Sequence, residues 1–180
     1  MFILYAVGIG IAIGALTGGR LDRLASLRIR AWPVAVAGLI VQLVLFSPLG
    51  ADLAGQLGPV LYVGSTAAVL LVVLLNVRIP GLALVAAGAA LNLAAIVANG
   101  GRMPADPAAL ASLGASIGDG YSNSVVLPDP ALRPLTDVFA MPAWLPLANV
   151  FSIGDVLIGV GVAIAIAVGM RGAPVREDTA

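Results

Sequence analysis

The feature that most constrains this chain is a set of five apolar runs that contain one charged side chain between them, Asp155. The runs are approximately Phe2–Leu16, Trp32–Leu49, Pro59–Val77, Gly81–Ala98 and Ile153–Met170. A helix needs about 17–25 apolar residues to cross a bilayer, and the first and last runs are near the lower limit. We therefore expect an all-α integral membrane protein, with a five-helix transmembrane bundle that forms a single membrane domain over residues 1–180.

The composition supports lipid as the solvent of these runs. Hydrophobic residues make up 61% of the chain and charged residues 10%, whereas soluble domains contain about 45–50% apolar and about 25% charged residues. A chain of this length leaves much of its surface outside the core, so it cannot bury such a surplus in water.

The charged and sulfur-containing residues exclude several classes of function. Nine cations, all of them arginine, balance nine acids, and there is neither histidine nor cysteine. The net charge of zero argues against a nucleic acid partner. Disulfides, cysteine nucleophiles and imidazole or thiolate metal sites are excluded. A carboxylate site for a hard cation is left, but the acids lack the spacing of a calcium loop. We expect no cofactor and no metal.

The arginines predict the orientation in the membrane. One side of the predicted bundle carries seven of them, and the other carries only Arg102 and Arg133. Because positive charge accumulates on the cytoplasmic side, the N-terminus and the connection 99–152 are expected outside and the C-terminus inside. The first run is interpreted as a permanent helix and not as a cleaved signal peptide, since its cations follow the apolar stretch. The seven arginines are Arg20, Arg23, Arg28, Arg30, Arg78, Arg171 and Arg176.

Small residues at every fourth position mark a packing seam in the first run, at Gly10, Gly14 and Gly18. Such seams let helices approach closely in lipid. One interpretation is a homo-oligomer or a membrane-protein partner that binds through this helix. The other, which we favour, is packing inside the chain. No internal repeat is found, and few polar residues lie in the runs, which argues against a transporter built from inverted repeats.

The connection 99–152 is rich in proline, which blocks long helices. Asp106 followed by Pro107 predicts the start of a short helix over 108–115, and 119–124 is expected to be a loop. The connection contains more large apolar residues than a disordered linker would. We expect it to fold along the outer membrane surface as a cap, and either a binding role or a purely structural role is compatible with this position.

Five polar side chains near the outer ends of the last two runs form our candidate site for a ligand or partner, and no catalytic residue is assigned. Asn92 and Asn99 share one helix face, and Asn99 also suits a helix C-cap. Ser152 and Asp155 match a capping box, so that Asp155 is a helix cap, a functional carboxylate or both. Gln42 is expected to bond to a neighbouring helix. The candidates are Asn92, Asn99, Arg102, Ser152 and Asp155.

Two segments, 98–104 (ANGGRMP) and 149–155 (NVFSIGD), carry a resemblance that covers most of the chain. With these segments the chain resembles an uncharacterised family of small multi-pass bacterial membrane proteins. The resemblance implies a location in the bacterial cytoplasmic membrane and no known activity.

A second resemblance rests on 88–95 (GAALNLAA) and 151–155 (FSIGD). These segments are similar to two motifs of lipoprotein signal peptidase, an aspartic protease within the membrane. The chain departs from that family because Ala95 stands where the first catalytic Asp belongs. Aspartic-protease chemistry needs two carboxylates that share a proton, so Asp155 alone is insufficient, and Asp106 or Asp137 would have to supply the second.

These observations favour a non-enzymatic membrane protein that binds membrane lipids or a membrane-protein partner at its outer face. The alternative is a divergent or inactive intramembrane protein that is similar to an aspartic peptidase.

Overall fold

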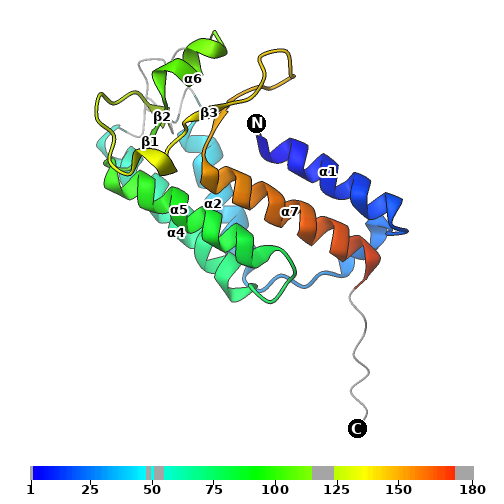
Figure 1. Ribbon diagram of the computed structural model, residues 1–180. Helices are drawn as coiled ribbons and strands as arrows, with labels where there is room; N and C mark the ends of the chain where they lie inside the picture. The colour runs from blue at the N-terminus through cyan, green and yellow to red at the C-terminus, as the bar shows by residue number, and fades with distance from the viewer. Residues whose placement is uncertain (1, 48–49, 51–54, 115–123, 173–180) are drawn as a thin grey trace.

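The computed structural model describes residues 2–47, 50, 55–114 and 124–172, and most of them are helical. Five long helices carry the fold (Figure 1). They are α1 (Phe2–Leu16), α2 (Trp32–Leu45), α4 (Gly58–Leu75), α5 (Leu82–Ala98) and α7 (Ile153–Arg171).

Two helical segments of the described chain are long and apolar enough to cross a membrane, judged by length and composition. They are Gly55–Leu75, in which the 3₁₀ turn η2 (Gly55–Leu57) precedes α4, and Ile153–Arg171. The other three helices are apolar but shorter. The second of the five ends at Leu45, before the end of its apolar run, because Ser47 precedes a proline and such a residue disfavours helical backbone.

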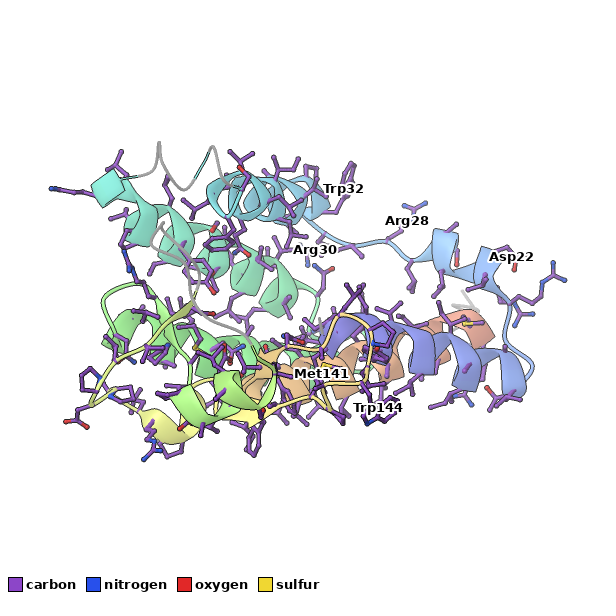
Figure 2. The ribbon with its side chains drawn as sticks, turned by 90° about the horizontal axis from the view of Figure 1, so that it is seen from above. Asp22, Arg28, Arg30, Trp32, Met141 and Trp144 are labelled. Atoms are coloured by element: carbon purple, nitrogen blue, oxygen red, sulfur yellow. The ribbon has the colours of Figure 1, made fainter. Side chains whose placement is uncertain are left out.

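The long helices follow one another as a row in space. Their principal packing contacts join α1 to α7, α7 to α5, α5 to α4 and α4 to α2. The first and last helices of the chain therefore lie side by side (Figure 1). The helix pair α2–α4 forms one end of the row, and an extended link that carries Arg28 and Arg30 joins α2 to α1 (Figure 2).

Small residues permit the closest helix contacts. A Cβ on Gly10 would lie 2.9 Å from the Cα of Ala163, and one on Gly88 would collide with the carbonyl oxygen of Gly154. Gly10 and Gly14 of the predicted seam thus face α7 of the same chain. Assembly with a second molecule through this helix stays a prediction.

Hydrogen bonds at the end remote from the cap, one between backbone groups and two with the Asn76 side chain, fasten the link between α1 and α2. The 3₁₀ helix η1 (Leu21–Ser26) follows α1, and Arg20 N–H donates to the carbonyl of Met170 at 2.7 Å. Asn76 accepts from Arg30 N–H at 2.8 Å and donates to the Arg30 carbonyl at 2.9 Å. The link between α1 and α2 is held in this way at both of its ends.

The cap, residues 99–152, contains short elements that pair with one another. Parallel strands β1 and β2 place Met103 opposite Ser124, and antiparallel strands β3 and β4 place Phe139 opposite Phe151. A further bridge joins Ala105 to Asp137. The elements are β1 (Met103–Pro104), α6 (Pro107–Ser112), β2 (Ser124–Val125), the 3₁₀ turn η3 (Arg133–Leu135), β3 (Phe139–Ala140) and β4 (Val150–Phe151).

These strands depart from an all-α fold, although the chain is mostly helical as expected. Each of the four has two residues, which is too short for an alternating pattern to reveal. Ser124, expected in a loop, lies in β2, while 119–123 lie outside the described residues.

The cap packs directly on the helices. Met103 of β1 joins Ala95 and Ile96 of α5 in a buried apolar cluster, against which Tyr62 and Leu135 also pack. This contact fixes the height of the cap above the ends of α4 and α5, and thereby the position of the polar groups that lie between the cap and α7.

Candidate functional site

Three of the five candidate residues meet where α5 crosses the start of α7. Ser152, which is fully buried, donates its hydroxyl to Asn92 Oδ1 at 2.8 Å. The Asn92 amide in turn donates to Asp155 Oδ1 at 2.9 Å. The glycines Gly88 and Gly154 let the two helices approach at this point. The structure thus connects two helices that are distant in sequence through one side-chain network.

The predicted capping box of α7 is confirmed. Ser152 Oγ accepts the N–H of Asp155 at 3.0 Å, and Asp155 Oδ2 accepts the N–H of Ser152 at 3.1 Å. Together with the Asn92 contact, this leaves both carboxylate oxygens of Asp155 with a protein donor. Asp155 is therefore held rigidly at the N-terminus of α7, where the helix dipole favours a negative charge.

Asn99 and Arg102 lie apart from this network. Asn99 is the C-cap residue of α5, as expected. Its side chain also donates to the carbonyl of Ala131 at 2.9 Å and accepts the N–H of Ala131 at 2.9 Å. Asn99 thus fastens a loop of the cap, and Arg102 lies half-buried in the turn before β1.

A pocket of about 520 Å³ opens between the cap, α1 and the start of α7. We call it the acidic pocket because two carboxylates, Asp137 and Asp155, line it. Asn99, Arg102, Asn92 and Ser152 are not among its lining residues. The lining consists of Phe2, Ile3, Leu4, Ser124, Asp137, Asn149, Val150 and Asp155.

Asp137 is the most unusual group of the pocket. Its backbone is used in strand-like pairing, because its N–H donates to the Pro104 carbonyl and its carbonyl accepts from Asp106 N–H, both at 3.0 Å. Its residue surface is only 8% exposed, yet within the described part of the chain no group donates a hydrogen bond to its carboxyl oxygens. Burial, and secondarily the charge of Asp155, raises the pKa of Asp137 to about 7.

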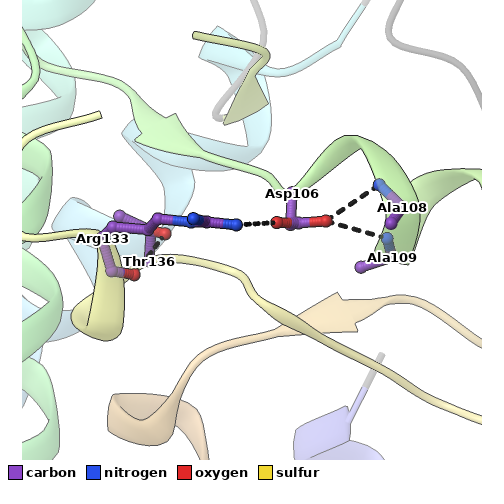
Figure 3. A network of polar contacts seen from close by, with 5 residues as sticks. All are labelled: Asp106, Ala108, Ala109, Arg133 and Thr136. Atoms are coloured by element: carbon purple, nitrogen blue, oxygen red, sulfur yellow. Dashed lines mark hydrogen bonds and ion pairs between the residues drawn. The ribbon is translucent and has the colours of Figure 1, made fainter. Parts of the chain in front are cut away.

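The neighbouring carboxylate, Asp106, has the opposite environment (Figure 3). As predicted, it is the N-cap of the short helix that begins at Pro107, and it accepts from the N–H groups of Ala108 at 2.8 Å and Ala109 at 3.3 Å. Arg133 pairs with its other oxygen at 3.1 Å. The hydrogen bond from Arg133, aided by the two backbone donors, lowers the pKa of Asp106. The helix ends at Ser112, earlier than expected.

Phe2, which lines the pocket, belongs to an aromatic stack. The rings of Phe2 and Phe151 lie 4.7 Å apart, and Phe139 stacks on Phe151 at 5.5 Å. The N–H of Phe2 donates to Asn149 Oδ1 at 3.0 Å, which ties the start of α1 to the cap. Ile3 and Leu4 follow on α1 and leave 40% and 50% of their surfaces exposed.

Gln42 shows what a structural polar group in these helices looks like. Its amide donates to Ser65 Oγ at 3.3 Å and to Thr66 Oγ1 at 3.1 Å, so the predicted bond to a neighbouring helix is confirmed. It joins α2 to α4.

The structure decides between the two acids considered as partners of Asp155. Asp137 lines the same pocket as Asp155, whereas Asp106 does not. Ala95 is fully buried in the apolar cluster of the cap. The sequence carried a weak signal for Asp137, since it is an acid in the apolar segment between Leu135 and Val138. No signal indicated that the start of α1 would join the site.

The model of a family described as Family of unknown function (DUF5317) matches residues 26–167. The chain belongs to this family, which confirms the resemblance to an uncharacterised family in that respect. No curated protein and no solved structure matches the chain.

Proposed function

We propose that this member of a family of unknown function is a multi-pass membrane protein whose acidic pocket binds a lipid or lipid-like amphiphile at the outer face. The five long helices are its spans, and residues 99–152 form the outer cap. The observation that carries the proposal is the pocket itself, which combines an apolar wall from α1 with two carboxylates.

The exposed surface of the helices supports the membrane location. Leu16, Leu43 and Val60 expose 87%, 75% and 67% of their surfaces, and many other large apolar side chains are exposed beside them. A soluble monomer rarely shows contiguous apolar surface on this scale. Charged side chains in the five helices are limited to Asp155 and Arg171, at the two ends of α7.

The distribution of arginines supports the orientation. The start of α1 and the start of α7 lie together at the cap, and their ends meet where Gly14 contacts Met170. That remote end carries Arg20, Arg23 and Arg171, and the link with Arg28 and Arg30 lies on the same side (Figure 2). The positive-inside rule then favours a cytoplasmic position for this end and an outer position for the cap.

The shape and chemistry of the pocket support an amphiphile. Ile3 and Leu4 are partly exposed on the flank of α1 and line the pocket as well. An acyl chain that lies along this flank would bring its polar end to Asp137, Asp155 and Asn149. Ligand sites commonly combine a mostly apolar lining with few polar groups in this way.

Cysteine labelling tests the membrane topology. The chain has no cysteine, so that a maleimide reacts only with the single cysteine that is introduced. Ser112→Cys lies exposed in α6 of the cap, and Ser26→Cys lies exposed in η1 at the opposite end. A membrane-impermeant maleimide added to intact cells should label Ser112→Cys and should reach Ser26→Cys only after lysis. Labelling of both before lysis would contradict the proposed topology.

Native mass spectrometry of protein released from its own membranes in a mild detergent tests the ligand. One defined lipid should stay bound to the wild type and be lost in Leu4→Trp, which fills the pocket. Ile13→Trp, farther along α1 and outside the pocket, is the matched control and should retain the lipid. Asn92→Ala and Asp155→Ala should reduce retention without abolishing membrane insertion. Equal retention in every variant would refute the site.

The same spectra test the partner interpretation. A stoichiometric second protein or a homo-oligomer without bound lipid would make the chain an assembly subunit. The first helix would then be the suspected contact, on a face other than the one that Gly10 and Gly14 turn to α7.

A second candidate function is a divergent aspartic hydrolase in the membrane. Two carboxylates line one pocket, and the pKa of Asp137 lies far above that of an ordinary carboxyl, which is an arrangement suited to an acid–base pair. The fixed position of Asp155 argues for binding instead, since both of its oxygens already accept hydrogen bonds from Asn92 and Ser152.

A peptide in which a secondary hydroxyl replaces the scissile carbonyl distinguishes the two candidates, because an aspartic hydrolase binds such a transition-state analogue tightly. The hydrolase predicts a higher melting temperature of the wild type with the peptide, and none of this effect in Asp137→Asn or Asp155→Asn. The absence of any shift in the wild type would exclude the hydrolase and leave the binding function.

A further inference from the structure

The polar end of the acidic pocket contains two acids that differ in the hydrogen-bond donors around them. Asp155 is supplied with donors from Asn92 and Ser152. Asp137 has no donor among the described residues, although only 8% of its surface is exposed. Its backbone bonds to Pro104 and Asp106 hold its main chain beside the pocket that its side chain lines.

A carboxyl group in a mostly buried position is costly in free energy when it carries a charge, and a partner that donates to it relieves this cost. No arginine lines the pocket within the described residues, and the chain contains no lysine. Among the described residues, therefore, no side chain supplies a donor to Asp137, whose carboxyl oxygens open into the pocket, where a ligand can donate to them.

The chemistry of the two acids limits the ligand to a cation that donates hydrogen bonds. The described residues contain no group of three or more acids, histidines or cysteines that would hold a metal ion, and hard cations such as Ca²⁺ take six or more oxygen ligands. A primary ammonium group carries three donors and one positive charge. It matches two carboxylates and the Asn149 amide better than a metal ion does.

The apolar wall limits the rest of the ligand. Phe2 is fixed by its stacking on Phe151 and by its bond to Asn149. Ile3 and Leu4 continue this wall along α1 toward the flank of the helix row. A ligand that fills the pocket thus needs an apolar part next to its polar end.

From this geometry we infer that the acidic pocket binds the primary ammonium group of an amphiphilic amine, with Asp137 as the acceptor that the protein leaves open. The inference rests on the proposed function and specifies its ligand. An amine headgroup of a membrane lipid and a free long-chain amine share this chemistry.

The test compares lipids that differ only in methylation of the amine. The purified full-length protein is stripped of lipid and mixed with equal amounts of phosphatidylethanolamine and phosphatidylcholine that carry the same acyl chains. Native mass spectrometry then measures the ratio of the two bound forms. A trimethylammonium group cannot donate hydrogen bonds, so the ratio should favour phosphatidylethanolamine by about tenfold, as expected for the loss of a charge-assisted hydrogen bond.

Two isosteric variants show which carboxylate causes the preference for phosphatidylethanolamine. In Asp137→Asn the ratio should fall to about one, which is the value expected when the charge-assisted bond is gone. Asp106→Asn changes the same functional group on the other side of the cap and should keep the wild-type ratio. Leu4→Trp leaves both acids intact and should lose both lipids, which separates blocking of the pocket from unfolding when gel filtration shows a monodisperse protein.

A further arm identifies the source of the amine. Displacement of bound phosphatidylethanolamine by dodecylamine, but not by dodecanol, supports the ammonium site. Binding of dodecylamine without binding of either phospholipid supports the ammonium site and overturns the lipid as its occupant. Equal binding of the two phospholipids overturns this inference and leaves the proposed function intact. Binding of neither phospholipid nor amine overturns both.

Discussion

Two aspartates of the cap, Asp106 and Asp137, have opposite environments. On the outer side, Asp106 accepts hydrogen bonds from two backbone N–H groups and from Arg133, and its pKa is lowered. On the inner side, Asp137 faces a pocket without a donor, and its pKa is raised to about 7. The two residues are neighbours, since Asp106 N–H donates to the carbonyl of Asp137.

This difference separates a structural carboxylate from a candidate binding carboxylate. The environment of Asp106 is complete within the chain, because one of its carboxyl oxygens accepts from two N–H groups of α6 and the other from Arg133. The carboxyl group of Asp137 has no donor among the described residues and opens into the pocket, where we propose that a ligand donates to it. The comparison therefore predicts that changes on the inner side affect stability and ligand together, whereas changes on the outer side affect stability slightly.

The largest effect is expected from Asp137→Asn in lipid-free protein. The folded-state pKa is raised, so the folded protein holds a proton that the unfolded chain has released. Stability of the wild type then falls as the pH rises from about 4 to about 7. The neutral amide avoids this loss, and at pH 8 the variant should be more stable by up to about 4 kcal/mol.

Thermal unfolding in detergent between pH 5 and pH 8 measures this prediction. Asp129→Asn, on an exposed part of the cap, is the control and should keep the pH dependence of the wild type. A variant with the same pH dependence as the wild type would show that Asp137 is not the responsible group.

Gly88→Ala should disturb the inner side by separating its two helices. A Cβ at this position would collide with the Gly154 carbonyl and lie 2.9 Å from Ile158 Cγ1. We expect a loss of about 1–3 kcal/mol, as for other overpacked cores. Gly64→Ala is the matched control, because nothing lies within 4 Å of its Cβ, and it should gain roughly 0.5–1 kcal/mol. Melting temperatures that change in the same direction for both would contradict the close α5–α7 contact.

Asn92→Ala and Gln42→Ala compare two polar contacts between helices. Removal of Asn92 takes away the acceptor of the Ser152 hydroxyl and the donor to Asp155 Oδ1, with an expected cost of about 1–3 kcal/mol. Gln42 bonds only to hydroxyl groups in the α2–α4 pair, and a cost near 0.6 kcal/mol is expected. Denaturation in mixed micelles measures the free energy of unfolding of both variants. A larger loss of this free energy in Gln42→Ala than in Asn92→Ala would contradict this assignment.

The smallest effect is expected from Asp106→Asn. Asparagine is also a good N-cap, and the ion pair that is lost involves an exposed Arg133, so that it contributes little. The folded-state pKa of Asp106 is lowered, so its contribution is present at neutral pH and is lost as the pH falls through that folded-state pKa. The melting temperature of the variant should be slightly lower at pH 7 and converge on the wild type in acid. A difference in melting temperature that grows in acid would contradict the lowered pKa of Asp106.

Local patterns in the sequence predicted the elements that depend on local physics. The helices near the five apolar runs, the N-cap Asp106, the C-cap Asn99 and the capping box of Ser152 and Asp155 are all found. The helices follow from the apolar runs themselves. Each cap depends on residues within one helical turn, so that their spacing in the sequence predicts the contact.

The inner side of the cap could not be predicted in this way, because it is built from pairings between residues that are distant in sequence. The bridge from Ala105 to Asp137 joins residues that are distant in sequence, and it decides which acid faces Asp155. The apolar wall needs α1 to lie parallel to α7, so that Phe2 reaches Asn149. Such contacts follow from the packing of the whole helix row, and no single segment contains the information.

The most direct test of the account is the titration of Asp137 in the folded protein. Carboxyl ¹³C signals of aspartate-labelled protein in detergent, assigned with Asp137→Asn, report each group separately. We expect Asp137 to give one carboxyl signal that titrates near pH 7 and that moves to lower pH when dodecylamine is added, because the ammonium group favours the charged form. A titration of Asp137 near the ordinary value of about 3.9, with no response to the amine, would contradict it.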